Sequence, residues 1–271
     1  MAGTGRARLA NPSSSRPAAA GSSLERSPSR SPMSESGRAL PPLRACLLSG
    51  GASRRMGQDK ALLPHPEGGC WLERSLTLLA GLELPISLLS RHPRHLELAR
   101  QWQETRTQAW QGREIATPQA LGRQPEPVAG HSDPAQARWF EALEEPPPRE
   151  GPLLALQRLM QAHPEQRLLL CPVDMPWLTL EVLQRLVAAS DTDPMAIQLA
   201  DDGERLQPLL GIYPSQARRR RALAEATANG ERRLQTWLAG QPCRAVRFDP
   251  RTLRNVNWPE EWLPNRSAST A

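Results

Sequence analysis

The residues best suited to chemistry lie in a glycine-rich segment, 48–60, that carries two cationic side chains. Gly50 and Gly51 follow a short apolar run. Such a pair lets backbone N–H groups turn toward an anion, because glycine tolerates positive φ and close approach. Arg55 offers planar donors to phosphate oxygens, and Lys60 offers a point charge. Together these residues predict a cradle for a triphosphate.

Lys60 is the single lysine among the 34 lysine and arginine residues of the chain. The abundance of arginine, alanine, proline and leucine is typical of a GC-rich genome, so a lysine retained here indicates a requirement for an ammonium group. A P-loop would read GxxxxGK[ST], whereas Lys60 is followed by Ala61, which excludes that motif. The alternative is an ordinary turn with one surface lysine.

A second candidate, Asp174, follows the apolar run at 168–171. In open α/β sheets, ligands bind beyond the carboxyl ends of the strands, which is where this carboxylate would lie. Pro172 and Pro176 stiffen the backbone on either side of it. A hard oxygen ligand suits Mg²⁺, which takes one or two carboxylates together with substrate phosphates. A turn or helix N-cap aspartate explains the residue equally well.

A third candidate is the pair Asn255 and Asn257, two of the five asparagines in the chain. If this segment is a strand, its alternation points both side chains to one side, where their amides could serve one ligand. A polar turn ahead of a helix that begins near Pro259 accounts for the same residues equally well.

The elements that must position these residues alternate between short apolar runs and amphipathic stretches. This alternation is typical of an α/β protein with a mostly parallel, doubly wound sheet. We expect strands at 45–48, 86–89, 167–171, 195–199 and 207–213, and helices at 71–82, 151–162, 180–189, 215–226 and 232–238.

The segment 94–150 interrupts this alternation with many glutamines and arginines and a run of three prolines. Helical pieces are plausible at 96–103 and 135–143, whereas 117–133 is typical of a loop. A loop of this length in a compact domain is either a functional lid or a disordered insertion, and both interpretations stay open.

Composition and charge exclude several classes of protein. A mean hydropathy of −0.53 and the lack of any run of about 20 apolar residues argue against a membrane protein. Four widely spaced cysteines form no CxxC pair, so we expect a reducing, cytoplasmic location. The net charge of +6 is concentrated in the Ser-, Pro- and Arg-rich residues 1–42, and without interleaved aromatic residues it gives little support to nucleic-acid binding.

The same composition sets the expected domain organisation. Residues 1–42 hold almost nothing to bury, so we expect a disordered tail. A transit peptide is a less favoured interpretation of this segment. One domain is expected at 43–264, with an insertion at about 94–150, followed by a short C-terminal tail at 265–271.

Four motifs in this order resemble those of one family, the molybdenum cofactor guanylyltransferases of the nucleotidyltransferase superfamily. The resemblance covers roughly residues 44–263 and leaves the N-terminal tail and 94–150 outside it. The family pattern LAGGxxxRMGxDKxL is matched by 48–62, GPLAG by 151–155, a strand ending in PxDxP by 171–176, and NxNTPEDL by 255–261.

The resemblance implies a three-layer, Rossmann-like nucleotidyltransferase fold with a mostly parallel, twisted sheet. It implies transfer of GMP from GTP onto the terminal phosphate of Mo-molybdopterin, giving molybdopterin guanine dinucleotide and pyrophosphate. The implied cofactor is Mg²⁺, and the implied partners are GTP, Mo-molybdopterin and, beyond these, molybdoenzymes or cofactor-insertion proteins. Neither a nucleic acid nor a membrane is expected as a partner.

Carried over position by position, the resemblance assigns a role to each motif residue. Catalysis falls to Arg55, Lys60 and Asp174, with Mg²⁺ held by Asp174. The pterin side falls to Asn255 and Asn257. The nucleotide-binding set comprises Leu48, Ser49, Gly50, Gly51, Gly57, Lys60, Ser90, Glu144 and Asp174.

Departures from the family pattern concern the base and the pterin rather than the phosphates. Ser90 stands where the family often has Asn, and Trp258 replaces Thr, while Ser49 replaces the usual Ala. The base-recognising carboxylate of the family precedes GPLAG, where Glu144 or Glu145 is the nearest candidate. Two alternatives therefore remain: a cytidylyltransferase acting on this or another phosphorylated acceptor, and a non-catalytic carrier of the finished cofactor.

Overall fold

The computed structural model describes residues 39–51, 56–114, 139–148 and 151–262. Within this part of the chain, no helix is long and apolar enough to cross a bilayer. The domain bounds given above stay predictions. Expectations for Arg55, the tail residues 1–38 and 265–271, and the loop at 117–133 lie outside the described residues.

One mixed sheet runs through the described part of the chain. Its strands are β1 (Leu43–Leu48), β2 (Ile86–Ser90), β3 (Phe140–Glu144), β4 (Arg167–Pro172), β5 (Ile197–Asp201), β6 (Leu206–Pro214) and β7 (Cys243–Arg247). The strand order is β3-β2-β1-β4-β6-β5-β7. Every neighbouring pair is parallel except those of β6, which lies antiparallel to β4 and to β5. The expected mostly parallel sheet is therefore confirmed.

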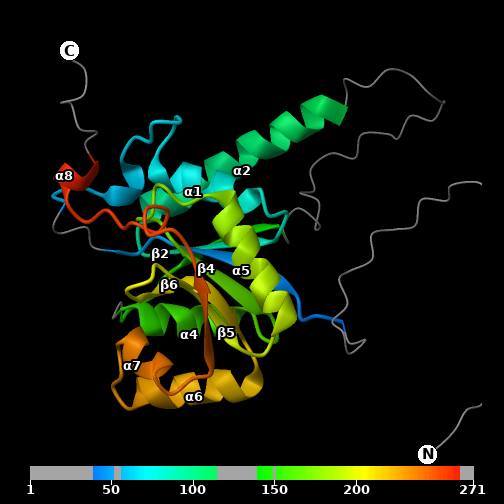
Figure 1. Cartoon of the computed structure of the whole chain (residues 1–271). Helices are drawn as coiled ribbons and strands as arrows, with labels where there is room; N and C mark the ends of the chain where they lie inside the picture. The colour runs from blue at the N-terminus through cyan, green and yellow to red at the C-terminus, as the bar shows by residue number, and fades with distance from the viewer. Residues whose placement is uncertain (1–38, 52–55, 115–138, 149–150, 263–271) are drawn as a thin grey trace, which may run out of the picture. The chain divides into compact units, whose positions relative to one another are not determined.

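Helices cover both faces of this sheet and make it the middle of three layers (Figure 1). One face packs against α1 (Trp71–Ala80), α2 (Pro93–Glu114) and α5 (Leu180–Thr192). The other packs against α4 (Pro152–Ala162), α6 (Ala217–Ala228) and α7 (Leu234–Leu238). Two short helices, η1 (Lys60–Leu62) and α8 (Pro259–Trp262), complete the helices of the described residues. The three-layer α/β architecture follows the expectation.

Strand alternation explains how β1 joins the two hydrophobic cores. Ala45 and Leu47 belong to the cluster that contains α1, α2 and α5, whereas Cys46 belongs to the cluster that contains α4. All three are 0% exposed, as expected for a central parallel strand with both faces covered. Burying a side chain such as Leu47 stabilises the fold by about 2 kcal/mol.

The helix expected at 135–143 is wrong. Residues 140–144 form the edge strand β3, which pairs parallel with β2, while 135–138 lie outside the described residues. The helical piece expected at 96–103 is part of the longer helix α2. The segment 94–150 therefore contributes a helix and a strand to the layers of the fold and is not a single insertion.

The carboxyl ends of four neighbouring parallel strands, β3, β2, β1 and β4, meet at one edge of the sheet, where the backbone continues to pair beyond the strands. Ser49 N donates to Leu89 O at 3.1 Å, and Val173 N donates to Leu48 O at 3.2 Å. Glu145 N donates to Ser90 O at 2.8 Å. The residues that follow β1, β3 and β4 are thus held by backbone hydrogen bonds, which gives this edge a defined geometry.

Candidate active site

A cavity of about 490 Å³ opens at this edge of the sheet. Ligands of open α/β sheets bind at such an edge, beyond the carboxyl ends of the strands. The amino end of α4 forms one wall, with Gly151 at φ +96° followed by Pro152 in the first turn. The other predicted residues on the wall are Leu48, Ser49, Gly50, Gly51, Lys60, Asp174 and Asn257.

Of the two glycines of the loop, Gly50 is the one at which a side chain would meet a cavity residue. A Cβ built there would lie 2.8 Å from Glu145 Oε2, closer than such contacts occur. Gly51 also lines the cavity, but a Cβ there would meet nothing. Gly57 adopts φ +66°, which suits glycine in a turn, and does not line the cavity.

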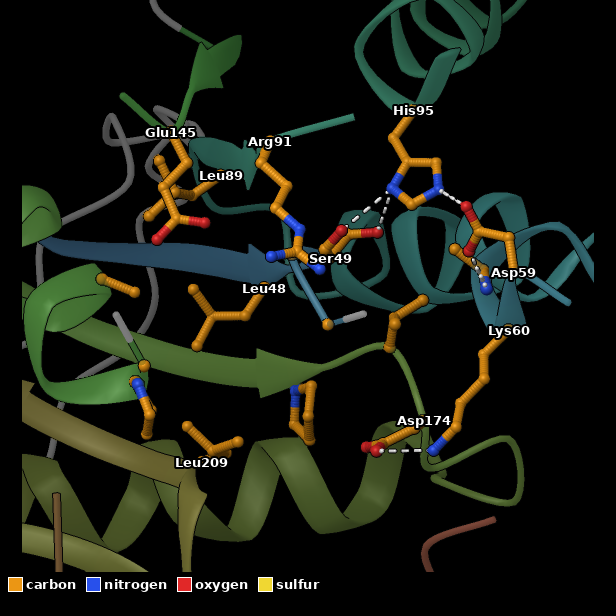
Figure 2. A pocket seen from close by; sticks show the side chains of 18 of the residues that line it. Leu48, Ser49, Asp59, Lys60, Leu89, Arg91, His95, Glu145, Asp174 and Leu209 are labelled. Atoms are coloured by element: carbon orange, nitrogen blue, oxygen red, sulfur yellow. Dashed lines mark hydrogen bonds and ion pairs between the residues drawn. The ribbon is translucent and has the colours of Figure 1, made fainter. Parts of the chain in front are cut away.

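Lys60 reaches the floor of the cavity from η1. Asp59 precedes this helix, and its Oδ1 accepts a hydrogen bond from Ala61 N at 3.1 Å. Lys60 Nζ donates to Asn257 Oδ1 at 2.9 Å and lies 3.5 Å from Asp174 Oδ2. The structure therefore brings the single lysine and the aspartate after β4 into one cavity, as Figure 2 shows.

Asp174 is held between two segments of the chain. Val256 N donates to Asp174 O at 3.0 Å, which fixes the main chain of the loop. Burial raises the pKa of the Asp174 carboxyl, and the ammonium of Lys60 opposes that rise. Removing a carboxylate from water disfavours its charged form, whereas a cation close to it favours that form.

Asp174 offers the cavity a carboxylate oxygen, the kind of ligand that Mg²⁺ prefers. Within the described ranges, no group of three or more His, Cys, Asp or Glu side chains is placed to hold a metal ion. A cation held by one carboxylate would take its other ligands from substrate phosphates and water. Mg²⁺ is bound in this way in many phosphate-transfer sites, whereas Zn²⁺ requires more protein ligands.

The two asparagines take different places. Asn257 lines the cavity and accepts from Lys60, whereas Asn255 does not line it, and its buried Oδ1 has no hydrogen-bond partner. The strand considered for this segment is wrong, because residues 254–257 have no strand assignment. Their path is held instead by hydrogen bonds, from Val256 N to Asp174 O, from Asn257 N to Glu261 Oε2 and from Lys60 Nζ to Asn257 Oδ1.

Ser90 and Glu144 do not line the cavity. Ser90 is fully buried behind the glycine loop, where its hydroxyl donates to Ser49 O at 3.0 Å. Glu144 is exposed at the end of β3, and the next residue, Glu145, is the carboxylate that lines the cavity. Arg158 Nη1 donates to Glu145 Oε1 at 2.8 Å, so this buried carboxylate is held in one orientation.

Sequence reasoning did not identify three polar residues of the cavity: Asp59, Arg91 and His95. His95 is 1% exposed and lies between Asp59 and Ser49 (Figure 2). For Arg91 a usable signal was present, since the residue directly follows the buried strand β2. His95 was missed because it falls within the segment interpreted as an insertion.

The solved structures most useful for comparison share the fold. The chain aligns with the molybdopterin-guanine dinucleotide biosynthesis protein A of Archaeoglobus fulgidus at a TM-score of 0.52 and 15% identity, covering 80% of this chain and 94% of that one. A nucleotidyl transferase from Methanothermobacter thermautotroptrophicus aligns at a TM-score of 0.54 and 14% identity, covering 81% and 94%. At these identities the likeness establishes the three-layer fold.

Sequence comparison is more specific. Residues 45–246 match the family described as MobA-like NTP transferase domain. A probable molybdenum cofactor guanylyltransferase of Rhodopirellula baltica is 32% identical over 83% of this chain and 92% of its own length. A protein of the same description from Mycobacterium tuberculosis H37Rv is 29% identical over 80% and 89%. The chain therefore belongs to the molybdenum cofactor guanylyltransferase family and carries its MobA-like NTP transferase domain.

Proposed function

We propose that this protein transfers GMP from GTP to the terminal phosphate of Mo-molybdopterin, giving molybdopterin guanine dinucleotide and pyrophosphate. The observation that carries this proposal is the placement of Lys60 Nζ 3.5 Å from Asp174 Oδ2 in a cavity that begins at a glycine loop. An ammonium and a carboxylate side by side on the wall of one cavity suit a bound triphosphate and its counter-cation. Family membership supplies the identities of the donor and the acceptor.

The residues of the chain act by position and charge. The attacking terminal phosphate of molybdopterin is already anionic at neutral pH, so the site needs no strong general base. Lys60 would stabilise the negative charge that develops on the departing pyrophosphate. Backbone N–H groups of Gly50 and Gly51 would hold the phosphates of the nucleotide, and we assign Arg55 to the same group.

Asp174 is the residue that would hold Mg²⁺. The bound cation supplies charge neutralisation and alignment of the phosphate oxygens. Asn257 accepts from Lys60 and so orients the ammonium, and the acceptor pterin would lie on the side of Asn255 and Asn257. Among the described residues, the buried Asn255 Oδ1 has no hydrogen-bond partner, and we assign Asn255 to the pterin side together with Asn257.

Glu145 is the residue we assign to recognition of the base. Its Oε2 lies directly over Gly50, and Arg158 holds the other oxygen. The Watson–Crick edge of guanine presents N–H donors that a carboxylate accepts. Cytosine presents mainly acceptors there and would place them against the negative charge. The cavity thus favours GTP over CTP.

The four cysteines are free thiols. This is the state expected in a reducing compartment, so we place the reaction in the cytoplasm. A carrier that only delivers finished cofactor would have no use for a metal-binding carboxylate beside the lysine. The pair Lys60 and Asp174 therefore favours an enzyme over a carrier.

The test is a panel of nucleoside triphosphates with Mg²⁺, in which pyrophosphate release is followed with and without molybdopterin. We expect release with GTP only when molybdopterin is present, and little release with CTP, ATP or UTP. Turnover with CTP and not with GTP would replace the proposal by the cytidylyltransferase alternative. Binding of nucleotide without turnover would favour the carrier.

A further inference from the structure

His95 is a buried imidazole that contacts two separate parts of the cavity wall. Its Nε2 donates to Asp59 Oδ2 across 2.7 Å. Its Nδ1 lies 2.8 Å from Ser49 Oγ, which donates to it, and 2.9 Å from Ser49 O. Ser90 Oγ lies 3.1 Å from the same nitrogen and donates to Ser49 O. One ring thus joins the glycine loop to Asp59 (Figure 2).

Asp59 links His95 to the helical turn that carries Lys60. Its Oδ2 accepts from His95, while its Oδ1 accepts from Ala61 N at the start of η1, the helix that carries Lys60. The two oxygens of one carboxylate therefore fix the imidazole and the first turn of the helix together. A movement of the His95 ring moves the turn that aims the Lys60 side chain.

His95 belongs to α2, which is anchored in the core by Leu96 and Ala99, 5% and 0% exposed. The ring thus ties both parts of the wall to a rigid element.

We propose that His95 is a positioning residue, which holds the glycine loop and the Lys60 turn at the separation that a nucleotide triphosphate requires. The proposal rests on the function proposed above and adds to it the residue that sets the geometry. Ser49 does not act as a nucleophile in this arrangement, since it is 1% exposed and its hydroxyl is bonded to the ring. His95 itself acts through Ser49 and Asp59 rather than on the substrate.

The variants His95→Asn and His95→Gln test the contacts of His95 with Ser49 and Asp59 one at a time, because each keeps only one of them. The amide of Asn reaches the position of Nδ1 and retains the contact with Ser49, whereas that of Gln reaches the position of Nε2 and retains Asp59. Because the bridge needs both ends, we expect each variant to lower kcat by about 10- to 100-fold, as small misplacements of catalytic groups do. We expect KM for GTP to change less than about threefold, because the glycine loop still binds the nucleotide and only the turn that carries Lys60 is displaced.

A matched control is His163→Asn. His163 is 5% exposed and lies 2.9 Å from Glu141, but it does not line the cavity. We expect this variant to lose a similar amount of stability, measured as the urea midpoint, and to keep the wild-type kcat. If a folded His95 variant also keeps the wild-type kcat, or if His163→Asn loses as much kcat as the His95 variants, the positioning role is overturned.

A second measurement does not depend on turnover, because Lys60 is the only lysine in the chain. Acylation of Lys60 by an activated ester can be quantified by peptide mass spectrometry with and without GTP and Mg²⁺. We expect GTP to protect Lys60 strongly in the wild type and in His163→Asn, and weakly in the His95 variants. Full protection in the His95 variants would overturn the positioning role.

The two measurements also separate this inference from the proposed function. If wild-type Lys60 is protected by GTP but no pyrophosphate is released, the transferase proposal fails while the positioning test still gives its answer. If the wild type turns over GTP and the His95 variants match it in kcat and in protection of Lys60, the transferase proposal stands and the positioning role fails.

Discussion

Two buried histidines, each paired with a partly exposed carboxylate, lie at opposite ends of the same strands. At the carboxyl ends, His95 pairs with Asp59 at 2.7 Å and lies 3.1 Å from Ser90 of β2. At the amino ends, His163 pairs with Glu141 of β3 at 2.9 Å and lies 3.0 Å from Ser87 of β2. The local chemistry is the same at both ends, so any difference in role comes from position.

The difference lies in what surrounds each pair. The pair at the carboxyl ends lines the cavity and adjoins the turn that carries Lys60. At the amino ends, Arg44 Nη1 forms an ion pair with Glu141 Oε1 at 3.1 Å. Neither His163, Glu141 nor Arg44 lines the cavity. In a parallel sheet, polar clusters at the carboxyl ends serve ligands, whereas matching clusters at the amino ends serve stability.

We expect the largest loss of activity from a substitution at the carboxyl ends of the strands and no loss from its counterpart at the amino ends. Lys60→Ala removes the ammonium that faces the departing pyrophosphate, so we expect a loss of pyrophosphate release on the order of 10²–10³-fold, with the fold retained. Arg44→Ala is its matched control, because each cation has a side chain 12% exposed and a carboxylate partner about a third exposed.

For Arg44→Ala we expect lower stability and wild-type turnover. The comparison between the two ends breaks down if Lys60→Ala releases pyrophosphate at the wild-type rate, or if Arg44→Ala loses activity while its urea midpoint is unchanged.

The sequence predicts the elements of the fold correctly where their hydrophobic periodicity is strong. The apolar runs of β1 and β4 and the amphipathic α1, α4 and α5 were placed within a few residues, because burial on both faces or on one stripe leaves a local pattern. β3 left no such pattern: its sequence FEALE places charged side chains in an edge strand, and the spacing equally suits a helix. The short β7, with burial only intermediate, was not anticipated either.

The site was readable only where a motif is local. The glycine loop and Lys60 lie within one short segment, and Asp174 directly follows a buried strand. His95 and Asp59 are 36 residues apart and meet only because β1 and β2 are parallel and end at the same edge. Such a contact is created by topology, so no spacing in the sequence predicts it.

Asp174→Asn should produce the next largest loss. The amide keeps the shape and volume of the side chain but removes the charge that would hold Mg²⁺. We expect turnover to fall on the order of 10²-fold and to respond weakly to added Mg²⁺, while circular dichroism and the urea midpoint remain close to wild type.

The same experiment has a control in the wild type, where a chelator should abolish pyrophosphate release and added Mg²⁺ should restore it. Full activity of Asp174→Asn, with an unchanged Mg²⁺ dependence, would show that this carboxylate does not hold the cation.

A smaller effect is expected from Gly50→Ala, which tests whether Glu145 faces the nucleotide. The new Cβ would approach Glu145 Oε2 to 2.8 Å and displace the carboxylate that Arg158 holds. We expect the preference for GTP over CTP, measured as the ratio of kcat/KM values, to fall by about tenfold, which corresponds to about 1.4 kcal/mol.

Repeating Gly50→Ala in a Glu145→Ala background shows whether the effect passes through the carboxylate. With the carboxylate absent, the extra methyl group should have little further influence on the preference, so the two substitutions should be strongly non-additive. Additive effects would instead mean that Gly50 and Glu145 influence the nucleotide independently.

The smallest effect concerns the amino ends of the strands and the dependence of stability on pH. The hydrogen bond from His163, together with Ser87 and the charge of Arg44, holds the pKa of Glu141 below its ordinary value of 4.5. The ionised form therefore stabilises the folded state at pH above 4.5, and this contribution is lost as the pH falls through the lower pKa of the folded protein. Glu141→Gln should lower stability by about 1 kcal/mol at pH 7.

Urea unfolding of the wild type and Glu141→Gln between pH 7 and pH 3 measures this contribution. The difference between the two proteins should shrink steadily as the pH falls below 4.5, because the wild type then loses the charge that the variant never had. Pyrophosphate release per folded molecule should be the same for both at pH 7. A constant stability difference across this range would show that Glu141 stabilises the fold by its shape and packing. The charge of Glu141 would then contribute nothing measurable to stability at the amino ends of the strands.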